Sequence, residues 1–432
     1  MERTREELMP GVWLTALRTD KFKTDVLSVT SLTQLSRETA AMNAVIPSVL
    51  RRGTVNYPDL RAVDSRLEEL YGALAVPAVR RIGEIQATGF LSTFAGAGLT
   101  PQGDDMMERA AGLVGELLLT PNTRGGLFLP DYVEGEKAKL LEKIRGRVND
   151  KGSYAITRLL ENMCCYEDFA VNKLGDEDSA ESIAYRRLTK HYRETLASAP
   201  MEVFYCGGAD TARVRAALRA ALDILPRGEI DGDIGTDIRM NAVEETPRVF
   251  TEEMDVTQGK LAMGWRLGEI MEDPDIAAIL VFNAVFGGGA TSKLFANVRE
   301  KLSLCYYASS AVDLQKGLLI AASGVDFDKF DPAREEILAQ LEAVKRGEVT
   351  AEELSAAKKS VETDLRLLSD DPLQLESWWL SQNLTGGEMS PPELAALVSG
   401  VTTDDIVRTA QSTEYDAIFY LKGQEGADSD GE

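Results

Sequence analysis

The sequence predicts an α+β protein built from two similar domains. Segments of strand-like composition meet in short turns, and helical segments gather in runs beside them. The same order of elements occurs twice, once in each half of the 432 residues. Strands joined by short turns form mainly antiparallel sheets, and we expect helices to cover one face of each sheet. The length suits two domains of about 200 residues each.

The first half is expected to open with a strand at 26–32. An apolar stripe at three- and four-residue spacing then predicts a helix over 60–71, which ends at Gly72. The remaining expected elements are strands at 73–79 and 84–94 around a turn at 81–83, a long helix at 131–148, a helix at 182–196 and a strand at 201–207.

The second half repeats this order. Its expected elements are a strand at 260–267, a helix at 291–301, strands at 304–312 and 318–323 around a turn at 316–317, helices at 332–346, 351–368 and 403–411, and a strand at 417–423. A Phe-Tyr pair lies in the last strand of each half, at Phe204-Tyr205 and at Phe419-Tyr420. Two copies of one domain would produce this pattern.

The stretch 226–247 contains glycines and acids but few large apolar residues, which is typical of a linker. We therefore expect a first domain at 1–225, a linker at 226–247 and a second domain at 248–423. The last residues, 424–432, have the composition of an acidic, solvated tail.

Composition excludes several classes of protein. Apolar residues make up 44% and charged residues 27%, which is typical of a globular protein. The net charge of −23 argues against nucleic acid or an anionic membrane as a partner, whereas a neutral or cationic peptide is compatible with it. The same acidity would also keep an abundant protein in solution. No apolar segment is long enough to span a bilayer, and four cysteines without a C-x-x-C pair fit the cytoplasm.

The most informative motif runs from Phe286 to Tyr307 and reads FGGGATSKLFANVREKLSLCYY. It resembles the second-domain signature of the pitrilysin or insulinase family, which includes the mitochondrial processing peptidases. In that family a glycine run enters a helix of the form S-R-L-F, followed by R-E-K and L-x-Y. The resemblance implies two domains that together form half of a clamshell around a peptide.

The glycine run Gly287, Gly288 and Gly289 is expected to bind substrate. Without Cβ atoms, its backbone can approach an extended peptide closely and can adopt positive φ angles. Thr291 or Ser292 can cap the helix that follows. The alternative is a flexible turn at a helix entry.

Arg299 and Tyr306 lie seven residues apart, the spacing of the arginine–tyrosine pair in this family. The resemblance implies that both reach the substrate near the scissile bond and that the tyrosine hydroxyl stabilises the developing oxyanion. A guanidinium offers several donors to carbonyl oxygens, and a fixed phenol donor lowers a barrier by a few kcal/mol. The alternative is a surface arginine at a helix end and a half-buried strand tyrosine.

The zinc motif of the family is missing. Active members carry H-x-x-E-H on a helix of the first domain. Alignment on Gly53-Thr54 places Ala44, Pro47 and Ser48 at the His, Glu and His positions. The whole chain contains one histidine, His191, which we expect on the surface, so a two-histidine motif cannot exist.

The segment around Glu142 resembles the family segment that bears the last zinc ligand. Without histidines to complete a zinc site, we interpret Glu142 as a relic of that site or as a solvated acid on a helix. We expect no metal and no cofactor in this chain, and zinc in a partner.

The resemblance implies a non-catalytic, substrate-binding subunit of a heterodimeric peptidase. A homologous partner with H-x-x-E-H would cleave the peptide, and Arg299 and Tyr306 would act in trans. The alternative is a peptide-binding or scaffold pseudopeptidase without a proteolytic role. A third class, an enzyme with unrelated chemistry, finds no support, because the sequence contains no G-x-S-x-G, P-loop or G-x-G-x-x-G motif.

Overall fold

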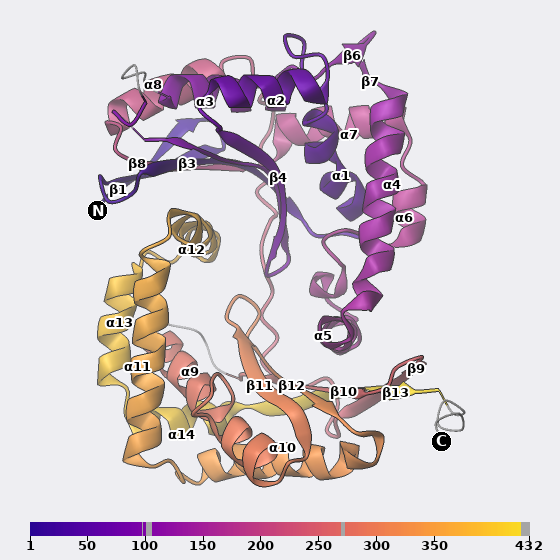
Figure 1. Cartoon of the computed structure of the whole chain (residues 1–432), viewed down its shortest axis with the longest axis vertical. Helices are drawn as coiled ribbons and strands as arrows, with labels where there is room; N and C mark the ends of the chain where they lie inside the picture. The colour runs from indigo at the N-terminus through magenta and orange to yellow at the C-terminus, as the bar shows by residue number, and fades with distance from the viewer. Residues whose placement is uncertain (97, 101–105, 269–272, 425–432) are drawn as a thin grey trace. The chain divides into compact units, whose positions relative to one another are not determined.

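The computed structural model describes residues 1–96, 98–100, 106–268 and 273–424. The chain folds into two compact units, and Figure 1 labels most of their helices and strands. Unit 1 consists of Met1–Gly146, Val171–Thr236 and Asp371–Gly387; unit 2 consists of Arg147–Ala170, Asp237–Asp370 and Glu388–Glu432.

Unit 1 contains a six-stranded sheet in the order β1-β2-β8-β3-β5-β4. Its strands are β1 (Glu2–Met9), β2 (Val12–Arg18), β3 (Thr24–Gln34), β4 (Leu74–Ile82), β5 (Ile85–Ala95) and β8 (Met201–Gly207). Neighbouring strands are antiparallel except for β2 and β8, which are parallel. β4 is therefore an edge strand, and β3 lies inside the sheet.

Helices cover both faces of this sheet, so the expectation that they cover one face is wrong. The helices of unit 1 are α1 (Ala40–Leu50), α2 (Leu60–Glu69), α3 (Met107–Leu119), α4 (Pro130–Gly146), α6 (Glu177–Glu181), α7 (Tyr185–Ser198), α8 (Thr211–Ala221) and α12 (Pro372–Thr385). Val29 of β3 points into the apolar core beneath α1, α3 and α7. The preceding residue, Ser28, points to the opposite face, as alternation along a strand requires, and donates a hydrogen bond to Glu376 of α12 at 2.7 Å. α12, which comes from the second half of the sequence, thus covers the face opposite to α3 and α7.

Unit 2 contains a five-stranded sheet in the order β11-β12-β10-β13-β9. Its strands are β9 (Arg248–Met254), β10 (Gly259–Arg266), β11 (Cys305–Asp313), β12 (Leu318–Val325) and β13 (Glu414–Gly423). Only β9 and β13 are parallel. The order and directions match those of unit 1, where β1 is the additional edge strand. Two related halves require such a match.

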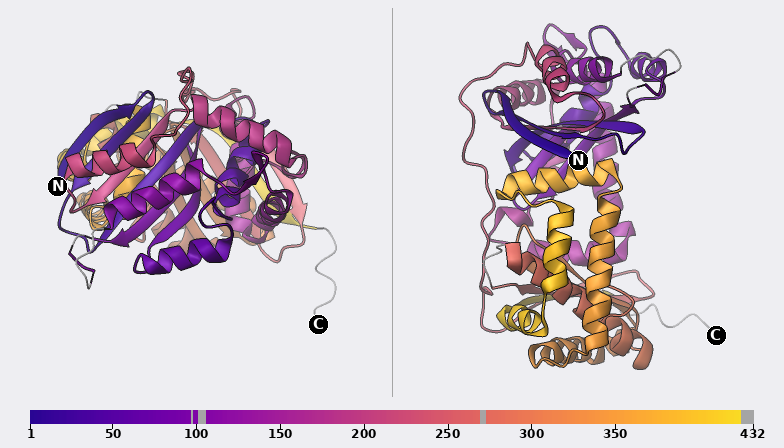
Figure 2. Two further views of the ribbon diagram at one scale, coloured as in Figure 1. Left: turned by 90° about the horizontal axis from the view of Figure 1, so that it is seen from above. Right: turned by 90° about the vertical axis from the view of Figure 1, so that its left-hand side faces the viewer.

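The second sheet is also covered on both faces. Its main helices are α5 (Lys151–Met163), α9 (Asp273–Phe286), the π-helix η3 (Leu294–Lys301), α10 (Phe330–Lys345), α11 (Ala351–Leu368), α13 (Pro391–Gly400) and α14 (Thr403–Ser412). Trp265 of β10 contacts Phe286 of α9, whereas Ala262 faces the apolar cluster of α5. α11 and α13 lie side by side, drawn in orange and yellow in Figure 2.

Two helices belong to the unit opposite to their place in the sequence. α5 comes from the first half but packs on the sheet of unit 2, and α12 comes from the second half but packs on the sheet of unit 1. The domain boundaries at 225 and 248 remain predictions. The two compact units agree with them except for the segments that contain α5 and α12. Residues 226–247, all of which the structure describes, contain no helix or strand.

The predicted α+β class is confirmed, but three strands of the two large sheets were not predicted. The structure places β1 and β2 before the first strand expected in the first half, and β9 before the first expected in the second. β1 was missed because its sequence, ERTREELM, is largely charged, which an edge strand tolerates. The predicted tail lies outside the described residues except for Gln424. No helix of the described ranges has the length and apolarity to cross a membrane.

Candidate functional site

The residues at the expected zinc-ligand positions lie on α1. Ala44 and Pro47 are buried, and Ser48 is half-buried. Ala44 and Ser48 face a cavity of about 340 Å³. The cavity is lined by Ala44, Val45, Ser48, Pro77, Val79, Glu136, Lys139, Leu140, Lys143 and Leu174.

This cavity does not offer a zinc site. Alanine has no ligand atom, and proline supplies no acid. The carboxylate in the cavity, Glu136, is already bound to two cations: Lys139 Nζ lies 2.8 Å and Arg52 Nη1 lies 3.3 Å from its Oε1. Among the described residues, no group of three His, Cys, Asp or Glu side chains could hold a metal ion. The donors present therefore do not fit the zinc that the family motif implies.

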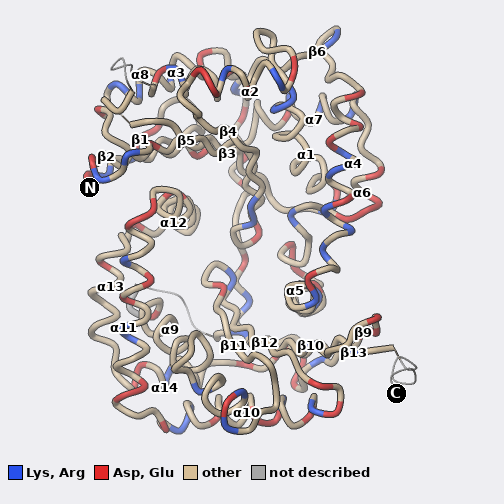
Figure 3. Tube along the Cα trace, in the orientation of Figure 1, with Lys and Arg blue, Asp and Glu red and all other residues tan. Residues whose placement is uncertain are grey.

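The carboxylate of α4 that faces α1 is Glu136, a residue that was not predicted from the sequence. Its side chain is only 8% exposed, whereas Glu142 is exposed and does not line the cavity. Figure 3 marks charges of both signs along α4. Glu136 shares its helix face with the buried Val133 and Leu140, at three- and four-residue spacing. That spacing is the signal that could have identified it.

The prediction that His191 lies on the surface is wrong. Its ring is half-buried, and Nε2 lies 2.6 Å from Oδ1 of Asn43 on α1, because this face of α7 packs against α1. Burial lowers the pKa of His191 below its ordinary value. Asn43 in turn donates to Gln86 Oε1 at 2.9 Å and to Thr33 Oγ1 at 3.1 Å. The histidine thus belongs to a polar network that fixes α1.

The three glycines differ in their surroundings. Gly287 is buried, and its carbonyl accepts a hydrogen bond from Ser310 of β11. A Cβ at Gly287 would come within 2.6 Å of the Ser310 backbone nitrogen, so close packing requires glycine there. Gly288 and Gly289 are exposed, and a Cβ at Gly289 would meet nothing within 4 Å. None of the three has a positive φ, so that expectation is wrong.

Arg299 lies near the end of η3, the helix that follows the glycines. Ser292 Oγ accepts a hydrogen bond from Phe295 N at 3.3 Å and so helps to cap this helix. The side chain of Arg299 is 43% exposed. Its guanidinium lies 3.4 Å from the adjacent Glu300 and 4.7 Å from the ring centre of Phe295. An exposed pair of this kind is worth little and leaves donors available.

Tyr306 is the extra residue of a bulge at the start of β11. Cys305 pairs with Val325 and Tyr307 pairs with Gly324, so Tyr306 has no partner on β12. A bulge re-aims the side chain that it carries. Tyr306 is 63% exposed, whereas the neighbouring Tyr307 is half-buried. The alternative of a half-buried strand tyrosine therefore describes Tyr307 and not Tyr306.

Arg299 and the start of β11 belong to one surface region of unit 2. η3 packs against β11. Burial raises the pKa of the Cys305 thiol, and a hydrogen bond with Ser323 and then the positive charge of Arg299 counteract part of that rise. The charge of Arg299 thus reaches the residue next to Tyr306. The structure brings both predicted residues to the surface at the η3–β11 junction.

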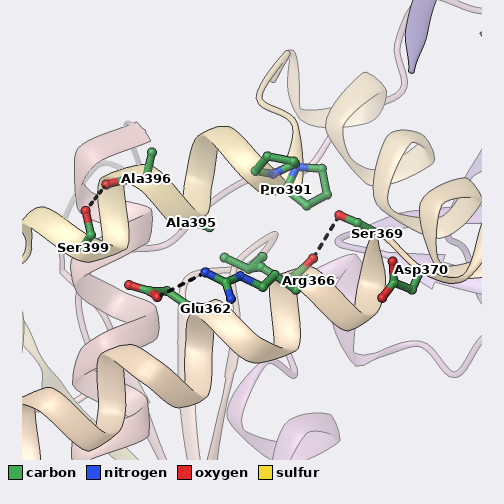
Figure 4. A pocket seen from close by; sticks show the side chains of 10 residues that line it. Glu362, Arg366, Ser369, Asp370, Pro391, Ala395, Ala396 and Ser399 are labelled. Carbon is green, nitrogen blue, oxygen red and sulfur yellow. Dashed lines mark hydrogen bonds and ion pairs between the residues drawn. The ribbon is translucent and has the colours of Figure 1, made fainter.

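Another cavity, of about 590 Å³, lies between α11 and α13 (Figure 4). Leu365, Pro391 and Ala395 provide its apolar wall. Its charged lining residues are Glu362, Arg366 and Asp370, of which Glu362 and Arg366 lie 4.0 Å apart on successive turns of α11. It contains none of the predicted site residues and no paired groups suited to acid–base or metal chemistry.

Comparison with known proteins agrees with the absence of zinc ligands. A family profile described as peptidase M16 inactive domain matches residues 182–361. A Bacillus subtilis protein described as "Probable inactive metalloprotease YmfF" is 30% identical over 418 residues, which cover 96% of this chain and 97% of that protein.

Solved structures show the same fold. A conserved protein from Enterococcus faecalis has a TM-score of 0.88 and 27% identity and covers 99% of this chain and 100% of its own. A peptidase M16 inactive domain from Pseudomonas fluorescens has a TM-score of 0.80 and 16% identity, covering 98% of this chain and 99% of its own. Together with its missing ligands, these similarities show that this chain belongs to the M16 (pitrilysin/insulinase) metallopeptidase family as an inactive member.

Proposed function

We propose that this chain is the non-catalytic, substrate-binding subunit of a heterodimeric M16 peptidase. Its partner would be a homologous chain with an H-x-x-E-H motif, which brings zinc and cleaves peptides. One observation carries the proposal: Arg299 and Tyr306 are both exposed at the η3–β11 junction, while the cavity beside α1 has no zinc ligands. A pseudopeptidase with no role in proteolysis has no need of this pair.

The chemistry of the pair suits a peptide that is being cleaved in trans. The Tyr306 hydroxyl has no hydrogen-bond partner within the described part of the chain, so it is available as a donor to an oxyanion. The Arg299 guanidinium presents several N–H groups to carbonyl oxygens of a bound peptide. Gly288 and Gly289, exposed beside this surface, offer backbone groups to the same peptide. The acidic chain favours neutral or cationic peptides, and we expect the subunit to act in the cytoplasm.

Affinity purification of this chain from its native cells, with mass spectrometry of the co-purifying proteins, tests the partnership. We expect a near-stoichiometric homologue that carries H-x-x-E-H. Recovery of the chain alone, or with unrelated proteins, would instead favour the scaffold role.

Peptide cleavage by the purified complex tests the pair itself. Arg299→Ala combined with Tyr306→Phe should lower kcat/KM by about 100-fold or more, because removing one oxyanion donor costs about that much. Tyr306→Phe alone should act mainly on kcat. Matched controls are Tyr166→Phe, on a tyrosine that is also exposed, and Arg346→Ala, on an exposed arginine paired with Glu348; both should leave turnover unchanged. Undiminished turnover in the double variant would overturn the assignment.

A further inference from the structure

The cavity beside α1 has room for a ligand because small residues stand at the expected histidine positions. Ala44 and Ser48 both line it, and its volume of about 340 Å³ is within the range of small-ligand sites. One part of the wall is apolar, formed by Val45, Val79 and Leu140. The remaining part carries a hydroxyl and charged groups. A ligand that fits must therefore have both an apolar and a polar portion.

The charge of the cavity is positive, although the chain as a whole carries −23. Its single acid, Glu136, is neutralised by Lys139 and by Arg52. Lys143 lies one turn beyond Lys139 on the same face of α4 and also lines the cavity. Within the described ranges Lys143 has no ion-pair or hydrogen-bond partner. The exposed Lys143 therefore brings an ammonium group with no counter-charge to a cavity that the Ser48 hydroxyl also lines, and two such donors can bind an anion.

We propose that this cavity, which Ala44 and Ser48 line at the expected histidine positions, binds a carboxylate group of a peptide. The Lys143 ammonium would donate to the carboxylate together with the Ser48 hydroxyl, and Lys139 would add a second positive charge. The apolar wall would receive the aliphatic part of the residue that bears the carboxylate. The carboxylate is either the C-terminus of the peptide or an acidic side chain. This site belongs to unit 1, whereas Arg299 and Tyr306 belong to unit 2, and its existence does not depend on a partner subunit.

Protection of lysines from acylation tests the site directly on the full chain. The chain is treated with acetic anhydride in the presence of a chelator, with or without a mixture of random hexapeptides, and mass spectrometry measures the modification of each lysine. We expect hexapeptides with a free C-terminus to slow the modification of Lys143 several-fold. Lys190, an exposed lysine of α7, is the internal control and should react at an unchanged rate.

Two further peptide mixtures separate the sources of the carboxylate. Protection by free-acid peptides but not by neutral, C-terminally amidated ones identifies the terminal carboxylate. Protection by amidated peptides that contain glutamate identifies the side chain. Equal protection by neutral amidated peptides, no protection at all, or equal slowing at Lys190 would overturn the proposal.

A variant gives an independent measurement. Lys143→Met should weaken binding of the protecting peptides, measured by fluorescence anisotropy, by about tenfold, since one charged hydrogen bond is lost. Lys143 has no partner among the described residues, so its replacement should not disturb folding. Lys190→Met should bind as the wild type does. Unchanged affinity in Lys143→Met, with a native circular dichroism spectrum, would contradict the proposal. Because neither readout involves cleavage, failure here is distinguishable from failure of the heterodimer model.

Discussion

At the scale of residues, a buried charge cluster holds α5 and its following turn on the sheet of unit 2. Arg266 is fully buried and lies 2.7 Å from Glu167 and 2.8 Å from Asp416. Lys316 binds Glu167 at 2.6 Å, and Arg248 binds Asp416 at 2.6 Å. Such clusters add little net stability, because desolvation offsets attraction, but loss of one member leaves an uncompensated buried charge. Each member therefore depends on the others.

Glu167 predicts a specific pH dependence. Burial alone would raise its pKa, but hydrogen bonds from Arg266 and Lys316 outweigh burial and hold the pKa below the ordinary 4.5. Its contribution to stability is thus full above that ordinary value and is lost as pH falls through the lowered one. In urea unfolding, Glu167→Gln should be about 3–5 kcal/mol less stable at pH 7.

The difference between wild type and Glu167→Gln should then shrink as the pH falls below about 4.5. The exposed Glu142 provides the control, since Glu142→Gln should change the unfolding free energy by no more than about 0.5 kcal/mol at any pH. Parallel stability curves for wild type and Glu167→Gln would show that the cluster does not depend on this carboxylate.

The site residues also show what a sequence can predict. The motif identified Arg299 and Tyr306, and the single histidine was enough to exclude H-x-x-E-H. The exposure of Tyr306 could not be predicted, because the bulge depends on the pairing of β11 with β12. The role of Glu136 was missed for a similar reason, since only the packing of α4 against α1 distinguishes it from the other acids of its helix.

At the scale of elements, α1 is an imperfect helix. Pro47 lies inside it and cannot donate a backbone hydrogen bond to the carbonyl of Asn43. The helix nevertheless forms, because most of its residues are buried in the core of unit 1 and Asn43 joins the network with His191. Tertiary packing thus outweighs the poor helix propensity of proline.

Replacing Pro47 by alanine should make the protein more stable. Proline is about 3 kcal/mol less favourable than alanine inside a helix, and losing two buried methylenes costs about 1.6 kcal/mol. The net gain in unfolding free energy should be about 1 kcal/mol, measured by urea denaturation. Pro372→Ala is the matched control, because Pro372 lies in the first turn of α12, where proline is tolerated. A loss of stability in Pro47→Ala would mean that the ring's packing outweighs the missing hydrogen bond.

Elements with local signals were predicted well. The helix expected at 351–368 coincides with α11, whose capping box joins Thr350 and Glu353. Strands 84–94 and 318–323 lie within one or two residues of β5 and β12. No local signal could show that α5 and α12 would each cover the sheet formed by the other half of the sequence, because that assignment depends on distant partners such as Arg266 and Arg80.

At the scale of the whole molecule, the exchange of α5 and α12 makes the two halves of the sequence interdependent. Glu376 of α12 is 1% exposed, and Arg80 and Ser28 of unit 1 both bind it. α5 buries Leu159 and Met163 in the cluster of unit 2. A piece of the chain that ends in the linker therefore lacks a helix it needs and exposes one it cannot bury.

Fragments test this interdependence. Residues 1–236, expressed alone, should aggregate or lack a cooperative thermal transition, whereas co-expression with 237–432 should give a folded complex, judged by circular dichroism and gel filtration. As a control, the intact folded chain is cleaved by a protease within 226–247. The two resulting pieces should stay associated, because each already contains a helix packed on the sheet of the other. A separately expressed 1–236 that unfolds cooperatively at the temperature of the intact chain would show that α12 is dispensable.

The exchange of helices also sets an order of events during protein synthesis. Unit 1 is missing one helix when the ribosome reaches Thr236, and that helix is complete only after Gly387. At about 5–20 residues per second the interval lasts roughly 8–30 s. During this interval, the face of β3 and β8 that α12 will cover is exposed. α5 cannot pack, because the strands that it covers have not been translated. The nascent chain therefore exposes two surfaces that chaperones can bind: the uncovered sheet face and the unpacked face of α5. Neither unit is complete until most of the chain has been translated.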